Sequence, residues 1–232
     1  MLGLTISLTL SFAGISLFFY QSKKVSRLKF LNREEHSARL LLLSSLGIIS
    51  CLFIGPIFFA IIMICIYVND AGLKVYEQIY KIKTVKIKSI IIELFILFIK
   101  FWPFLFLSSL FSAFLLPDYP AQESIQELRS SNYSSQVKII ITALFIAPIV
   151  EELIFRKFLF VALIKKSGLL WASIISSFCF SLVHLNLSAF LVLFILGLFL
   201  SYSYLKFGTL IAPVICHFLF NLIMITSILS GH

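Results

Sequence analysis

The stretch APIVEELIFR, residues 147–156, places two adjacent glutamates and an arginine inside an otherwise apolar run. From residue 139 to residue 164 the charged side chains are Glu151, Glu152, Arg156 and Lys157. A carboxylate near the middle of a membrane-spanning helix costs on the order of 2.5–3.5 kcal/mol. Two neighbouring carboxylates at that depth need an explanation, and the one we favour is catalysis.

The rest of the chain surrounds this stretch with hydrophobic segments. The 232 residues are 60% hydrophobic and 12% charged, whereas a soluble domain is nearer half apolar and a quarter charged. Apolar runs long enough to cross a hydrocarbon core of about 30 Å recur along the chain, without the alternation of barrel strands. The sequence therefore predicts an all-α fold, a polytopic transmembrane helical bundle of about seven membrane segments, within a range of about six to eight.

These segments divide the chain into two halves. The N-terminal half, residues 1–138, is expected to contain spans near 2–20, 40–68 and 90–116. The C-terminal half, residues 139–232, is expected to contain spans near 139–164, 169–187, 189–205 and 208–229. The polar loop between the halves contains SIQE at residues 124–127, which is typical of a capping box and predicts a short surface helix.

The charge distribution favours a membrane protein over a nucleic-acid-binding one. Lysine and arginine outnumber aspartate and glutamate by 19 to 10, and most of the excess lies in the loops, as the positive-inside rule predicts. Because basic residues follow the first segment, an uncleaved anchor is favoured over a cleaved signal peptide. Gly55-Pro56 interrupts the second run, so residues 40–68 are compatible with one kinked span or with a re-entrant pair of half-helices. The topology of residues 40–88 depends on this choice.

The glutamates in the quoted stretch differ in their local partners. Glu152 and Arg156 are four residues apart, so they share one helix face and can pair. Glu151 is rotated by about 100° from Glu152 and has no such neighbour. Glu151 is therefore the candidate for a reactive group, and its partners are expected from other segments.

Two further segments supply candidate partners. His217 and Asn221 are also four residues apart and present an imidazole and a carboxamide on one face. His184 lies in another segment, with Phe180 one turn before it, where its ring can pack beside the imidazole. Together with Glu151, these side chains can deprotonate a water and hold the charge that develops on a carbonyl oxygen.

Each of these groups also has a purely structural interpretation. A Glu–Arg pair can serve packing alone, and a histidine in a membrane helix can be an interhelical hydrogen-bonding residue. Ion- or proton-coupled transporters use the same kinds of side chain. A transporter is expected to have duplicated halves with paired interruptions, and this sequence has no evident repeat.

Three motifs, taken together, resemble those of the CPBP family, which comprises CAAX proteases and bacteriocin-processing enzymes and is also called Abi. EELIFR matches the EExxxR motif, FSLVH matches FxxxH, and HFLFN matches HxxxN, in the same order. The resemblance covers roughly residues 139–225 and leaves residues 1–138 as a variable half. It implies an intramembrane endopeptidase whose active-site cavity lies among the helices.

The resemblance also implies a role for each matching residue. Glu151 would activate water with the aid of His184, and His217 with Asn221 would stabilise the oxyanion. The supporting residues would be Glu152, Arg156 and Phe180. Glu151, His184 and His217 could together bind a divalent metal such as zinc, but a glutamate-activated water needs no ion, so we favour a site without a metal cofactor.

The function predicted from this resemblance is hydrolysis of a peptide bond in a membrane-associated protein or peptide, in peptide processing or bacteriocin immunity. The expected partners are membrane lipid and that substrate, without nucleic acid, and the expected location is a bacterial cytoplasmic (inner) membrane. The alternatives are an ion- or proton-coupled transporter and a non-catalytic immunity or scaffold protein of the same fold.

Overall fold

The computed structural model describes residues 45, 48, 87–116 and 123–230. All the secondary structure in this part of the chain is helical, which confirms the all-α class. The predictions for residues 2–20 and 40–88, including the anchor and the re-entrant alternative, fall almost wholly outside the described residues.

The described part consists of seven α-helices and two π-helical segments: α5 (Ile87–Leu115), α6 (Glu123–Ser130), α7 (Tyr133–Ile141), η2 (Thr142–Ile146), α8 (Ala147–Glu152), η3 (Leu153–Phe160), α9 (Val161–Leu182), α10 (Leu187–Phe207) and α11 (Ile211–Leu229). By length and composition, three of the described helices can cross a bilayer, namely those over Ile91–Leu115, Leu187–Phe207 and Ile211–Leu229. They match three of the expected spans to within about three residues. The total of about seven spans stays a prediction.

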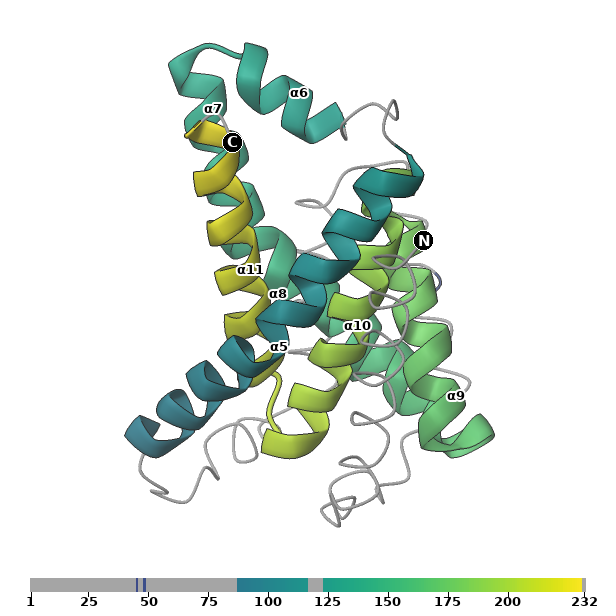
Figure 1. Ribbon diagram of the computed structural model, residues 1–232. Coiled ribbons are helices and arrows are strands. Elements are labelled where there is room, and N and C mark those ends of the chain that lie inside the picture. Colours follow the sequence, from purple (N-terminus) through teal and green to yellow (C-terminus); the bar gives the residue numbers. More distant parts are fainter. Residues whose placement is uncertain (1–44, 46–47, 49–86, 117–122, 231–232) are drawn as a thin grey trace.

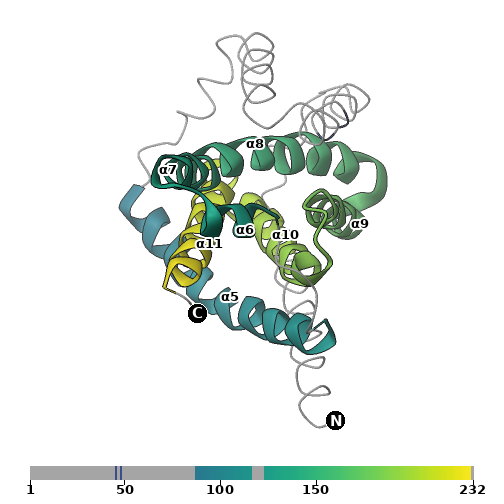
Figure 2. The same cartoon turned by 90° about the horizontal axis from the view of Figure 1, so that it is seen from above.

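Helix α10 is the centre of the bundle. Seen from above, α5, α9, α11 and the run through α8 surround it (Figure 2). Its sequence is apolar all round, which is typical of a helix buried on every side. Two-thirds of its most apolar window, 67%, is accordingly buried inside the protein. The elements that carry the motifs are thus held around one common core.

A glycine allows α9 and α10 to approach each other closely. A Cβ atom placed on Gly197 of α10 would lie 2.8 Å from the Cβ of Ser177 and 3.0 Å from its Cα. Small residues at such a crossing let two membrane helices pack backbone to backbone. The close approach also leaves the main chain of Gly197 accessible to side chains from the neighbouring helical run.

The helix that carries the glutamates is longer and less regular than the expected span near 139–164. Helical structure runs from Tyr133 through η2, α8 and η3 into α9, where Gly168 interrupts it with a φ of 78°. The two π segments flank α8 directly. Pro148 stands at the start of α8, and a proline inside a helix removes one backbone donor. Wide π turns of this kind are frequent at functional sites.

Helix α9 ends earlier than the expected span near 169–187. Its last residue is Leu182, and His184 lies in the turn that follows. The reason is local, because Leu185 adopts a left-handed φ of 51°, which no α-helix accommodates. Asn186 then begins α10 as an N-cap, accepting a hydrogen bond from the amide of Ala189 at 2.9 Å. The imidazole of His184 is therefore presented from a turn.

The short helix predicted in the polar loop is present as α6. It lies across the end of the bundle, next to α7 (Figure 1). Its Leu128 is buried in a small cluster with Leu144 and Ile225. The side-chain amide of Gln136 donates a hydrogen bond of 3.1 Å to the carbonyl of Leu128, which fastens α6 to α7.

Candidate active site

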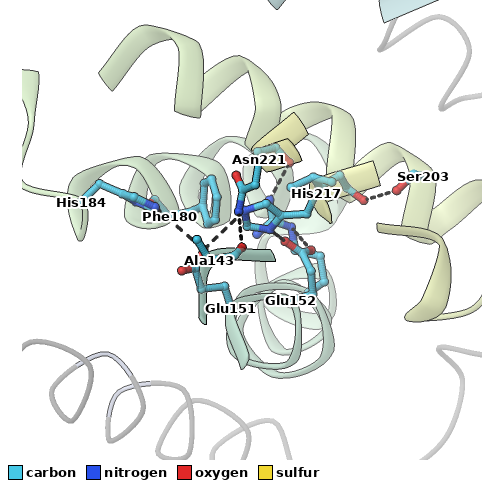
Figure 3. A network of polar contacts seen from close by, with 11 residues as sticks. Ala143, Glu151, Glu152, Phe180, His184, Ser203, His217 and Asn221 are labelled. Atoms are coloured by element: carbon cyan, nitrogen blue, oxygen red, sulfur yellow. Dashed lines mark hydrogen bonds and ion pairs between the residues drawn. The ribbon is translucent and has the colours of Figure 1, made fainter. Parts of the chain in front are cut away.

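The predicted site residues come together from three separate elements. Glu151 and Glu152 lie on α8, His184 follows α9, and His217 and Asn221 lie on α11. Figure 3 shows these side chains converging on one spot beside the ring of Phe180. Residues that are up to about 70 positions apart in the sequence therefore share one site.

Glu152 and Arg156 form the fully buried side of this site. Arg156 Nε lies 3.1 Å from Glu152 Oε2, and both side chains have 0% exposure, which confirms the pairing predicted from their spacing. The guanidinium also donates through Nη2 to the carbonyl of Gly197 at 3.2 Å. Burial of two charges is tolerated when they are paired and hydrogen-bonded. Each member of this pair has one hydrogen bond, from Arg156 to Gly197 and from His217 to Glu152, whereas Glu152 Oε2 and Arg156 Nε and Nη1 make none to a described residue.

Glu152 also holds His217. Oε1 of Glu152 lies 3.0 Å from Nδ1 of His217, whose side chain is 3% exposed. A carboxylate paired with Arg156 can only accept, so Nδ1 of His217 carries the hydrogen. The other ring nitrogen, Nε2, then faces Glu151, with 3.7 Å between Nε2 and Glu151 Oε2.

His184 is oriented in the same way by a different acceptor. Its Nδ1 lies 2.8 Å from the main-chain carbonyl of Phe180. Because a carbonyl only accepts, Nδ1 of His184 is the donor. Its Nε2 therefore points to the other side, 3.8 Å from Oε2 of Glu151.

Glu151 is the point at which the two imidazoles meet. Its Oε2 makes no hydrogen bond to any residue in the described part of the chain. Its distances to the two Nε2 atoms, 3.7 and 3.8 Å, are longer than a hydrogen bond but within ion-pair range. Glu151 is 20% exposed, against 0% for Glu152. Of the two glutamates, it is the one whose side chain is partly exposed, although Oε2 itself is buried.

Phe180 packs against both histidines and Arg156 at once. Its ring centroid lies 5.0 Å from that of His184 and 5.6 Å from that of His217, and the Arg156 guanidinium lies 4.5 Å above its face. The expected contact with His184 is confirmed. The ring also contacts His217 and Arg156, so it is an apolar wall between the two histidines.

Asn221 makes a contact that its motif did not suggest. Its Nδ2 donates a hydrogen bond of 2.8 Å to the main-chain carbonyl of Ala143 in η2. The acceptor is a carbonyl, which identifies the atom facing it as the amide nitrogen. This bond ties α11 to the helical run that carries the glutamates.

The three residues expected to bind a metal, if the reaction uses one, lie close to one another. Glu151, His184 and His217 are the donor types that zinc prefers. Among the described residues, however, no three His, Cys, Asp or Glu side chains are grouped so that they could hold an ion.

Three residues of this site were missed by reasoning from the sequence. Gly197 accepts from Arg156, Ala143 accepts from Asn221, and Pro148 interrupts the helical hydrogen bonding next to Ala143. Only Pro148 has a signal in the sequence, because a proline three residues before the glutamates lies inside a predicted helix. The other two take part through backbone carbonyls, which every residue has.

Two comparisons with known proteins concern the same part of the chain. Residues 133–223 match the model of the family described as Type II CAAX prenyl endopeptidase Rce1-like. A segment of 82 residues is 34% identical to a Bacillus subtilis (strain 168) protein named "Putative membrane peptidase YdiL". That match covers 35% of this chain, and the chain spans about a third of the relative's length, 34%.

No solved structure matches the chain. The family match contains all three motifs and every predicted site residue from Glu151 to Asn221. With the three membrane-length apolar helices, the matches identify an integral membrane protein.

Proposed function

Since this chain belongs, over residues 133–223, to the CPBP family of CAAX-type membrane proteases, we propose that it is an intramembrane endopeptidase. The observation that carries the proposal is the position of Glu151. Its Oε2 faces the Nε2 atoms of two histidines whose other ring nitrogens are both already held. A carboxylate and two oriented imidazoles around one point can act on a single small reactant.

The first step is the activation of a water molecule by Glu151. The carboxylate takes one proton from the water as its oxygen forms a bond to the carbonyl carbon of the substrate. Nε2 of His184, with Nδ1 occupied by the Phe180 carbonyl, accepts a hydrogen bond from the same water and orients it. Deprotonation by a positioned base contributes typically 10²–10⁴-fold to the rate.

The second step is stabilisation of the negative oxygen of the tetrahedral intermediate. His217 donates to that oxygen through Nε2 when the ring is protonated, and Glu152 accepts the hydrogen on Nδ1 at 3.0 Å. A carboxylate behind an imidazole fixes the ring and stabilises its cationic form. The second N–H of Asn221 is available as another donor to the same oxygen. A preorganised donor of this kind contributes a factor of about 10²–10³ to kcat.

Collapse of the intermediate completes the reaction. Glu151, now protonated, gives the proton to the leaving nitrogen as the C–N bond breaks, so that one water is consumed per peptide bond. Glu152 and Arg156 contact no reacting atom in this scheme and act by positioning His217 and Glu151.

The substrate class is a peptide segment held in or against the membrane. The described part of the chain has three helices that are long and apolar enough to cross a membrane, and one of them, α11, carries site residues. The matched family is described as Type II CAAX prenyl endopeptidase Rce1-like. We propose a membrane-associated peptide or protein as substrate, in peptide processing or bacteriocin immunity.

The test is cleavage of a peptide library by the purified protein in liposomes, with prenylated and unmodified peptides as separate sets. Wild type is compared with Glu151→Gln and His184→Ala. Glu127→Gln is the matched control, because it removes the charge of an exposed glutamate on α6. We expect cleavage to be slowed by about 10²–10⁴-fold in Glu151→Gln, strongly reduced in His184→Ala, and unchanged in the control.

Cleavage that survives both active-site substitutions overturns the proposed mechanism. Activity that a chelator removes and zinc restores replaces it with a metal-dependent one. Absence of cleavage in wild type, combined with proton or ion flux that depends on Glu151, would favour the transporter alternative.

A further inference from the structure

The carbonyl of Ala143 is released from the helix by a proline. In η2 the amide of Ala147 donates to the carbonyl of Thr142, one residue further back than in an α-helix. In the same wide pattern, the carbonyl of Ala143 would be bonded by the amide of residue 148. That residue is Pro148, which has no N–H. The helix therefore contains no donor for Ala143 at this point.

The missing donor is supplied by another helix. Nδ2 of Asn221 on α11 donates to the Ala143 carbonyl at 2.8 Å. Ala143 is partly buried among helices. A carbonyl in such a place is costly to leave without a partner, and in a membrane environment water is a poor substitute. The hydrogen bond from Asn221 thus takes the place of the helical hydrogen bond that Pro148 cannot donate.

This arrangement joins the two sides of the site. Pro148 stands three residues before Glu151, and Asn221 stands one turn after His217. The bond from Asn221 to Ala143 therefore fixes η2, which leads directly into α8, against the part of α11 that carries the imidazole. It also uses one of the two hydrogens on Nδ2, which sets the direction of the other.

We propose that Pro148 is a positioning residue, which releases the Ala143 carbonyl so that Asn221 binds it and holds Glu151 and His217 in register. The link between Pro148 and Asn221 concerns the fold alone and does not depend on the proposed function. Its consequence for turnover rests on the proposed function.

The link is tested by a double-mutant cycle in thermal unfolding, using Pro148→Ala, Asn221→Leu and the double variant in the full-length protein. Asn221→Leu in the wild-type background leaves the Ala143 carbonyl without a donor, and we expect Tm to fall by about 2–4 °C. Pro148→Ala restores an N–H that can reach that carbonyl. In its background we expect Asn221→Leu to lower Tm by less than half as much.

Pro103→Ala is the matched control. Pro103 also lies inside a helix, α5, but it is exposed and belongs to a different element from Ala143. In this background Asn221→Leu is expected to have its full effect. Equal losses of Tm in the wild-type and Pro148→Ala backgrounds overturn the link. Should Asn221→Leu fail to fold in the wild type, Asn221→Ala takes its place in the same cycle.

The consequence for turnover is read from kcat and KM separately. We expect Pro148→Ala to lower kcat by about 10–100-fold, because small displacements of reacting groups are costly, with KM nearly unchanged and Tm not reduced. Pro103→Ala should leave kcat unchanged. An unchanged kcat in Pro148→Ala overturns the positioning role.

Failure of this inference can be distinguished from failure of the proposed function. The unfolding cycle needs no substrate, so it gives a result even if no peptide is cleaved and the proposed function is wrong. Conversely, additive Tm values in a protein whose cleavage depends on Glu151 would overturn this inference alone.

Discussion

The two neighbouring glutamates of α8 have opposite surroundings. Glu152 is fully buried and contacts Arg156 at 3.1 Å and His217 at 3.0 Å. Glu151 is 20% exposed, and its contacts to His184 and His217 are 3.8 and 3.7 Å long. Every short contact is on the Glu152 side. The difference supports the proposal that Glu152 is structural and that Glu151 is the group that reacts.

The same contrast extends to the residues around each carboxylate. The Glu152 side includes Arg156 and Gly197, joined by a hydrogen bond to a main-chain carbonyl. The Glu151 side includes His184, which comes from a turn and is 17% exposed. Changes on the first side should therefore affect stability, and changes on the second should affect turnover.

The largest effect is expected from Glu151→Gln. Removing the carboxylate should lower kcat/KM by about 10²–10⁴-fold and leave Tm the same or higher, since no hydrogen bond to a described residue is lost. The measurements are peptide cleavage in liposomes and thermal unfolding of the same preparation. A large fall in Tm would show that Glu151 is structural and would remove the contrast.

Arg156→Leu is expected to have the largest effect on stability. The substitution leaves the buried carboxylate of Glu152 without its cation, and breaking a buried pair in this way costs about 3–5 kcal/mol. Denaturant unfolding measures the loss. The double variant Glu152→Leu with Arg156→Leu removes both charges and should recover much of it. Equal stability of the two variants would contradict the interpretation of the pair.

Gly197→Ala is expected to have an intermediate effect on stability. The new methyl group would lie 2.8 Å from the Cβ of Ser177, so α9 and α10 must separate. Overpacking of this kind costs about 1–3 kcal/mol, and it moves the carbonyl that Arg156 binds. Denaturant unfolding is again the measurement, and adding Ser177→Gly should restore part of the stability. No rescue would mean that the close approach is not the cause.

The smallest effect is expected from Phe180→Leu, which tests the wall between the two sides. The replacement keeps an apolar side chain of similar volume, so the free energy of unfolding should fall by less than about 1.5 kcal/mol. Both imidazoles lose a ring contact of 5.0 to 5.6 Å. We expect a modest fall in kcat with KM unchanged. If Phe180→Tyr, which keeps the ring, retains the wild-type kcat, the fall in Phe180→Leu is due to loss of the ring contacts.

Much of this site could be predicted from local spacing. The pairing of Glu152 with Arg156 follows from a separation of four residues, and the contact between Phe180 and His184 follows from the same rule. The spans of α5, α10 and α11 follow from continuous apolar runs. These features depend on residues that are neighbours along one helix, and periodicity describes such neighbours well.

Periodicity along the chain did not predict the end of α9 or the π-helical segments. The early end of α9 depends on the left-handed conformation of Leu185, and a leucine gives no warning of it. The π segments on either side of α8 shift the register of the helical hydrogen bonds, whereas periodicity assumes a constant 3.6 residues per turn.

The sequence by itself determined that this is a helical membrane protein, because its apolar runs are too long and too continuous for any other solution. It also determined which side chains were candidates for catalysis, because lipid makes isolated charges expensive. Only the tertiary structure decided which distant groups surround Glu151 and Glu152. Their surroundings come from His184, His217 and the Gly197 carbonyl. Contacts between distant segments depend on how helices pack, and that packing has no period along the chain.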